Sequence, residues 1–440
     1  MHSRDRRLGP IVLGLLLGLS FACALGRPSQ VSPSEIPELE SRVARDPNNG
    51  DLVLRFAAAL FADGRCDTAL VTARRGGELS PRNSLGPLVV GQCLEQAGRY
   101  PEAITTYNAF ASLYPEAPGI GAVRGRVVLA QRAHATSIAR RALAAEDSLS
   151  ALTPDPETVG VLPLVVAGDS AYEPLSLGLA EIIRADLALL QRFRTVERLQ
   201  LQALVNELAL STTDLVDQAT AVRVGRLAQA GRLVQGTAAI QRLDETRLEA
   251  SVVLRSGEVT GPASAEGDFR DLLVLEKELV LGIANALGYQ LTVAERQRVL
   301  DNGTQRLAAF LAYASGLSAE ERGDYRTAAL HFAEAVRQDP GFGAAQERHA
   351  AAVGADIMTQ ATPSEITTVG TAVDAAMPSP GVVQVADAFV TAVIDVSGTQ
   401  GESATAPGAG GLTTSTTVDP PPALPFTPRT ITVIFRIPLP

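Results

Sequence analysis

The sequence predicts an α+β multidomain protein in which α-helical hairpins flank a small mixed α/β domain. Three observations lead to this prediction: a 34-residue repeat early in the chain, alternating strand and helix patterns over 157–291, and a return of the hairpin pattern near residue 316. A chain of 440 residues is also too long for one core, since single cores stop growing at roughly 250 residues, so two to four domains are expected.

Composition limits both the kind of core and the class of partner. Of the residues, 46% are hydrophobic but only 4% are aromatic and none is Trp, which favours closely packed helices built from Ala, Leu and Val. The net charge is −10, and Lys277 is the only lysine. Because nucleic acid requires a basic face, we expect no nucleic-acid partner.

Residues 1–24 have the layout of a secretory signal peptide. A basic segment with Arg4, Arg6 and Arg7 precedes the apolar stretch 11–19, which is too short to span a bilayer permanently. The signal predicts export to the periplasm.

Two cleavage sites compete at the end of this signal. Cleavage before Cys23 would leave a lipidated cysteine and anchor the protein to the outer membrane, whereas cleavage after Ala24 would release a soluble secreted protein. Because the chain has only three cysteines, the placement of one at this point favours lipidation of Cys23.

The strongest signal is a repeat of 34 residues. Small residues and prolines recur at this interval: Gly64, Ala69 and Pro81 return as Gly98, Ala103 and Pro115. Small residues allow two antiparallel helices to touch, and proline ends the second helix because it lacks a donor. The pattern resembles a tetratricopeptide repeat. We expect such repeats and a capping helix over 36–150.

A third copy of the repeat stands apart, at 304–350. It carries Gly316, Gly323, Tyr325, Ala328, Phe332, Ala335 and Pro340 at the spacing of the same template. The first helices of such hairpins line a groove for protein partners. On that basis Arg55, Gln92 and Glu95 are the candidate partner-binding residues.

Cys66 and Cys93 remain after the signal. An oxidising compartment favours a disulfide between them. Their positions along neighbouring helices differ by about a turn, however, which strains the geometry of a bridge. We therefore expect two small buried hydrophobic residues, with a disulfide as the alternative.

Between 157 and 291 the pattern changes to strands and helices in alternation. The expected elements are strand 159–166, helix 175–193, strand 193–198, helices 199–210 and 214–228, the hairpin 232–241 and 247–255, and a closing helix 268–287. 

This region contains a set of short motifs: Val161-Leu162-Pro163, Thr195-Val196-Glu197-Arg198, Leu201, Leu204, Glu207, Gly225 and Leu233-Val234-Gln235-Gly236. Together they resemble the periplasmic α/β domain of the CsgG/FlgO-type envelope family, whose fold is similar to the amino-terminal domain of TolB. The family includes the curli secretion channel and flagellar-associated lipoproteins. The resemblance implies the fold and the periplasmic compartment. It does not imply channel activity, because the long insertions of that channel are replaced here by short loops.

No pattern of catalytic, metal-binding or cofactor-binding residues is found. The histidines His2, His134, His331 and His349 have no cysteine or acidic residue at ligand spacing. Asp169-Ser170 lacks a nucleophile elbow, and Gly225 and Gly231 belong to no nucleotide-binding motif. We expect no enzyme activity, no cofactor and no metal. Glu197-Arg198 is expected to cap or orient the helix that follows.

Residues 351–440 are rich in Ala, Thr, Gly, Pro and Ser and predict a low-complexity tail. Its last part, 431–437, alternates like an exposed strand, which would pair with the sheet of the same chain or with a partner.

The function predicted from these features is that of a non-catalytic cell-envelope scaffold or assembly factor whose partners are other envelope proteins. Membrane attachment is expected only through Cys23, and the oligomeric state stays open. The alternatives are a subunit of a curli-type secretion apparatus and an envelope enzyme.

Overall fold

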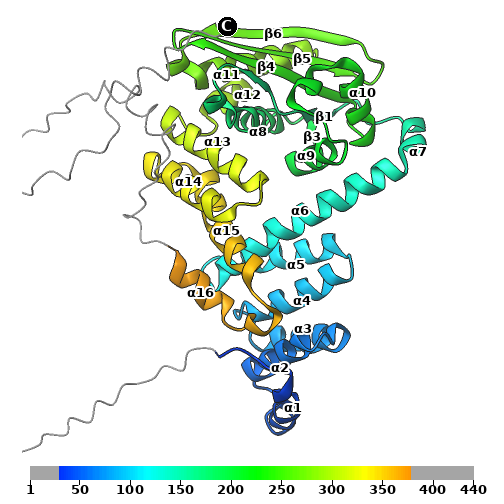
Figure 1. The fold of residues 1–440 in the computed structure, drawn as a ribbon, viewed down its shortest axis with the longest axis vertical. Coiled ribbons are helices and arrows are strands. Elements are labelled where there is room, and N and C mark those ends of the chain that lie inside the picture. Colours follow the sequence, from blue (N-terminus) through cyan, green and yellow to red (C-terminus); the bar gives the residue numbers. More distant parts are fainter. Residues whose placement is uncertain (1–28, 378–440) are drawn as a thin grey trace, which may run out of the picture.

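The computed structural model describes residues 29–377 and has the predicted α+β multidomain architecture. The signal segment 1–24 with Cys23, and the predicted strand 431–437, lie outside the described residues. Figure 1 shows an elongated molecule with the sheet at one end and α1 at the other. The long helix α6 runs between them.

The amino-terminal part is a stack of helical hairpins. α3 and α5 begin 34 residues apart and are matched along their whole length. Within each hairpin the turn passes through a glycine with positive φ, 75° at Gly64 and 70° at Gly98, a conformation that favours glycine. The helices are α1 (Ile36–Arg45), α2 (Gly50–Ala62), α3 (Cys66–Leu79), α4 (Leu85–Gln96), α5 (Tyr100–Leu113), α6 (Ile120–Ala144) and α7 (Glu146–Ala151).

Small residues stand where the helices of a hairpin approach each other, as the repeat predicts. Ala69 and Ala103 are completely buried. The Tyr107 ring lies directly over Gly91, and the Phe332 ring lies over Gly316 in the later hairpin, so neither glycine has room for a side chain. 

The α/β domain contains one mixed sheet in the order β3-β1-β4-β5-β6, with β2 also paired to β4. β1 runs parallel to β3 and β4, whereas β4, β5 and β6 are antiparallel. The strands are β1 (Thr158–Val161), β2 (Val165–Ala167), β3 (Arg194–Thr195), β4 (Arg232–Arg242), β5 (Glu245–Leu254) and β6 (Val259–Gly267). The helices are α8 (Leu175–Ala188), α9 (Arg198–Glu207), α10 (Gln218–Leu227), α11 (Leu272–Ala286) and α12 (Val293–Asp301).

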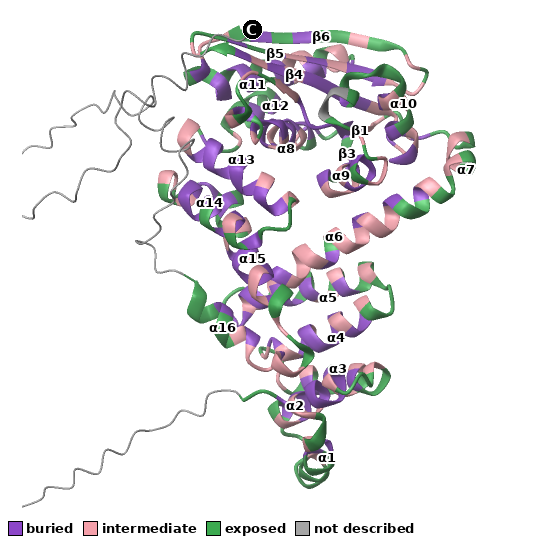
Figure 2. Cartoon of the chain, in the orientation of Figure 1, coloured by how far each residue is buried: buried purple, intermediate pink, exposed green. Residues whose placement is uncertain are grey.

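Helices cover both faces of this sheet. In the β4–β5 register Ala238 is opposite Leu248 and Val234 opposite Val252, and all four belong to the core formed with α8 and α11. Leu233, on the other face of β4, packs in a second core with α9, α10 and the carboxyl-terminal half of α6. Figure 2 shows the buried residues, in purple, along the strands and the helices that pack on them.

Several details of the α/β domain differ from the sequence prediction. The strand expected over 159–166 is two strands, because Pro163 interrupts it. The helix expected from 214 begins at 218, after a 3-10 turn. β6 and α12 were not predicted. β6 has little apolar alternation and contains Gly261-Pro262, so its sequence does not read as a strand.

Helical structure continues well beyond residue 350, where the low-complexity tail was expected to begin. That boundary was wrong, because the small residues that suggested a tail are needed for close helix packing. Gly354 meets Gly125 of α6 with no space for a Cβ atom on either. The last helices are α13 (Leu307–Glu321), α14 (Tyr325–Gln338), α15 (Gly343–Gln360) and α16 (Val369–Ala376).

The carboxyl-terminal helices return to the amino-terminal hairpins. α15 and α16 pack along α6, and the backbone N–H of Val31 donates to Ser364 O at 3.0 Å. One continuous core includes residues of α2 to α6 and of α13 to α16. The two hairpin regions therefore form a single helical body, from which the α/β domain emerges between α6 and α13.

Candidate functional site

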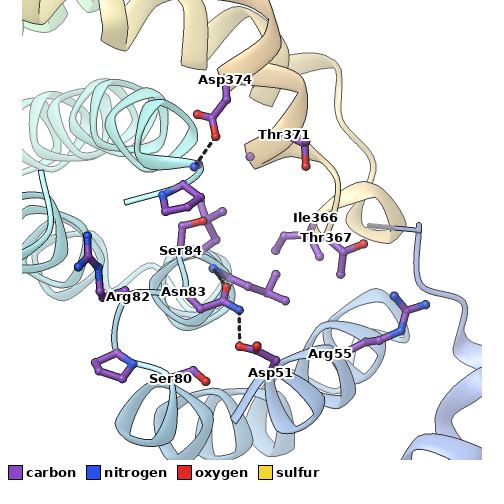
Figure 3. Close-up of a pocket in the computed structure, with 16 residues that line it drawn as sticks. Asp51, Arg55, Ser80, Arg82, Asn83, Ser84, Ile366, Thr367, Thr371 and Asp374 are labelled. Atoms are coloured by element: carbon purple, nitrogen blue, oxygen red, sulfur yellow. Dashed lines mark hydrogen bonds between the residues drawn. The ribbon is translucent and has the colours of Figure 1, made fainter. Parts of the chain in front are cut away.

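A pocket of about 890 Å³ lies where the amino-terminal hairpins meet the carboxyl-terminal segment (Figure 3). Its walls come from α2, from the turn between α3 and α4, from the start of α6 and from the segment around α16. The residues that line it are Asp51, Arg55, Ser80, Pro81, Arg82, Asn83, Ser84, Leu85, Leu88, Pro118, Gly119, Ile366, Thr367, Gly370, Thr371 and Asp374.

The pocket combines apolar walls with polar groups held in fixed positions. Leu88 and Ile366 are buried in its floor. Asn83 Nδ2 donates to Asp51 Oδ1 at 3.0 Å, and the dashed lines in Figure 3 mark this bond and the one at Asp374. Arg82 is exposed. An apolar cleft with a few placed polar groups suits a protein segment or a small ligand.

Of the three predicted groove residues, the structure places only Arg55 in this pocket. Its guanidinium donates to Glu35 Oε2 at 3.0 Å and to the carbonyl of Ser29 at 3.2 Å. The arginine therefore also holds the chain that leads into α1.

Gln92 and Glu95 lie away from the pocket, on the side of α4 that packs on other helices. Glu95 forms a partly buried ion pair with Arg126 and accepts a hydrogen bond from Tyr107 Oη at 2.7 Å. Burial, followed by the charge of Glu95, raises the pKa of Tyr107 well above its usual value. Gln92 Nε2 is buried without a hydrogen-bond partner. Helical spacing alone did not give the rotation of α4, which directs both side chains into the protein.

Cys66 and Cys93 form a disulfide, with their Cα atoms 5.3 Å apart. The expectation of two unbonded residues is corrected here. α3 and α4 run antiparallel, so the first turn of α3 lies beside the last turn of α4, and the difference in offset does not separate the two sulfur atoms.

Loss of this disulfide is expected to destabilise the amino-terminal hairpins. The bond joins residues 27 apart, and closing a loop of that size stabilises by about 3 kcal/mol. We expect the double variant Cys66→Ala, Cys93→Ala to unfold at a lower urea concentration than oxidised wild type. Reduced wild type serves as the control and should approach the variant. An unchanged wild-type midpoint on reduction would contradict the prediction.

A buried ion cluster joins the α/β domain to the helical body. We call it the interface cluster: Glu181 of α8, Arg198 of α9, Glu320 and Glu321 of α13, and Arg348 of α15. Arg198 is 3.1 Å from Glu320 and 3.6 Å from Glu321, and Arg348 is 2.8 Å from Glu320.

Neighbouring arginines favour the ionised form of Glu181. Burial opposes the charged form of Glu181, but a hydrogen bond from Arg184 and the charges of Arg348 and Arg198 outweigh it and lower the pKa of that carboxyl. Arg198 thus joins two parts of the molecule, whereas the sequence predicted that it would act with Glu197 at the start of α9.

The only lysine of the chain is at the centre of a second buried group. We call it the lysine cluster: Lys277 and Glu276 of α11, Asp186 of α8 and Asn302 after α12. Lys277 Nζ is 2.6 Å from Asp186 Oδ2 and 3.2 Å from Glu276 Oε2. Asn302 donates to the other oxygen of Asp186 at 2.7 Å. The cluster ties α8, α11 and the end of α12 together.

Glu276 is completely buried, and burial followed by the nearby Asp186 charge raises its pKa well above the usual value. Stability from such a group is present below the unfolded pKa, near 4.5, and is lost as pH rises towards the folded pKa. In Glu276→Gln the side chain is neutral at every pH, like the protonated carboxyl of Glu276. We expect urea unfolding to show the variant gaining stability relative to wild type as pH rises above about 4.5.

A difference between the two proteins that does not change with pH would contradict this prediction. The exposed Glu278→Gln on the same helix is the control, and its difference from wild type should stay small throughout.

Among residues 29–377 no three His, Cys, Asp or Glu side chains are grouped to hold a metal ion. His134, His331 and His349 lie on different helices. Burial lowers the pKa of His134 and of His349. Every helix between residues 29 and 377 is too short or too polar to span a lipid bilayer.

No family model matches the chain, and no curated protein matches it. Among solved structures it is similar to the C-terminal domain of LpoB from Salmonella enterica, with 19% identity and a TM-score of 0.21. The similarity covers 30% of this chain and 94% of that one. Values this low assign no function. The tetratricopeptide and CsgG/FlgO-type resemblances stay predictions from the residues.

Proposed function

We propose that the protein is a non-catalytic scaffold or assembly factor of the bacterial cell envelope, and that it binds a segment of another envelope protein in the pocket between α2, α4, α6 and α16. The pocket is the observation that carries this proposal. Its volume of about 890 Å³, apolar floor and polar rim suit several side chains of a protein segment.

The arrangement of the helical body and the α/β domain supports a scaffold role. The helical body surrounds the pocket with rigid elements, and the interface cluster fixes the α/β domain to that body. A partner bound at the pocket and another bound to the sheet domain would be held in a defined relation. The signal segment and Cys23 support a periplasmic location with a lipid anchor to the outer membrane, and a secreted soluble protein is the alternative. Mass spectrometry of the mature amino terminus tests that part.

Site-specific photo-crosslinking in intact cells tests the binding role. A crosslinking amino acid at Arg82, exposed at the pocket, is expected to capture a discrete envelope protein. The control position is Val71 on α3, which is 67% exposed and does not line the pocket. The proposal is wrong if both positions give the same crosslinked products, or if neither gives any while the protein is present at the cell envelope.

A further inference from the structure

α16 occupies a seat made of glycines beside the pocket. A Cβ atom on Gly121 of α6 would lie 2.5 Å from Val373 of α16. A Cβ atom on Gly119 would lie 3.0 Å from the Cα atom of Gly370. We call Gly119 and Gly121 the glycine seat. Their lack of side chains lets a short helix lie directly against the start of α6.

Only a few contacts keep α16 in this position. The helix has eight residues, of which only Val369 and Val373 are buried. Asp374 Oδ2 accepts a hydrogen bond from the N–H of Gly119 at 2.8 Å. The remaining surface of the helix is largely small and exposed.

α16 also leaves much of the groove unfilled. Gly370, Thr371 and Asp374 form one wall of the 890 Å³ pocket, so the open volume lies immediately next to the seat. Figure 3 shows Thr371 and Asp374 on this wall, with a dashed line from the Asp374 carboxylate to the backbone nitrogen that donates to it. A helix with larger side chains on the side that faces the pocket would fill both the glycine seat and the pocket. It would make contacts that α16 does not make.

We infer that the groove takes a short amphipathic helix of another envelope protein, with two aliphatic side chains one turn apart and an acidic residue directly after the second. α16 has this pattern in Val369, Val373 and Asp374, and it occupies the seat until the partner helix displaces it. The inference rests on the proposed function and deepens it: the partner helix fills the same pocket and takes the place of α16 as one of its walls. Displacement is driven by the additional contacts in the pocket, since a ligand shifts an equilibrium only by its differential affinity.

A labelled synthetic peptide of residues 361–377 tests this with the full-length chain. Wild type should bind it weakly, because its own α16 fills the seat. Val373→Asp in the chain should release α16 and increase peptide affinity at least ten-fold by fluorescence anisotropy. Ala372→Asp, an exposed position on the same helix, is the matched control and should bind like wild type.

A second, milder variant tests the inference in case Val373→Asp does not fold. Asp374→Ala removes only the acceptor for Gly119 N–H and should increase affinity about three-fold. The inference fails if wild type binds the peptide as tightly as Val373→Asp, or if Asp374→Ala binds no better than wild type. If the peptide binds the variants as expected but a crosslinking amino acid at position Arg82 captures no partner, the displacement of α16 from the glycine seat is confirmed and the proposed function is wrong.

Discussion

Lys277→Met is expected to destabilise the α/β domain by about 3–5 kcal/mol, because it removes the cation from a buried ion pair and leaves the partner charge uncompensated. Asp186 and Glu276 both have no exposed surface, and Lys277 lies within hydrogen-bonding distance of each. Methionine has a similar length, so the loss reflects charge more than volume. Chemical unfolding followed by circular dichroism measures the effect.

Two further variants separate charge from packing in this cluster. Combining Lys277→Met with Asp186→Asn and Glu276→Gln removes every charge and should recover a large part of the loss. Glu278→Ala, exposed on the same helix, should change stability by less than about 0.5 kcal/mol. A Lys277→Met protein that unfolds at the wild-type denaturant concentration would refute the buried ion pair.

Arg198→Met is expected to cost about 3 kcal/mol and to loosen the α/β domain from the helical body. Arg198 is almost fully buried and reaches Glu181 on its own domain and Glu320 on the other. Arg348 still pairs with Glu320 in the variant, which keeps the cost at the lower end for a broken buried pair. The expected signature is a separation of one unfolding transition into two.

The matched control is Arg140→Met, which breaks an exposed pair between the same two regions. Arg140 on α6 is 2.8 Å from Glu207 on α9, but its side chain is 70% exposed, so the cost should be below about 1 kcal/mol. A double-mutant cycle of Arg198→Met with Glu320→Gln should give a coupling of about 1 kcal/mol or more. Equal costs for the buried and exposed pairs would contradict the role given to Arg198.

The hairpins could be predicted because their determinants are local. Gly64, Gly98 and Gly323 stand at the same place in three turns, and their φ angles lie between 70° and 77°. Each glycine meets a requirement of its own turn, so it repeats with the helix pair. β6 could not be predicted in this way, because its pairing with β5 is a tertiary effect that overrides a sequence with glycine and proline.

Most of the candidate site could not be predicted, for two physical reasons. Arg55 does line the pocket, but Glu95 does not, because the rotation of α4 depends on its packing with Arg126 on another helix. Asp374 and the rest of α16 were missed because a run of small residues looks alike whether it is a tail or a helix in close contact. Only the facing Gly119 and Gly121 distinguish the two.

The packing of α15 and α16 against α6 also affects the order in which contacts form during folding. Gly119 and Asp374 are joined by a hydrogen bond across 255 residues, and the whole α/β domain lies between them in the chain. Contacts of such long sequence separation form late, because closing so large a loop is costly before other structure exists. In a chain made from the amino terminus onward, Gly119 at the start of α6 would therefore stay uncovered until α16 has been made.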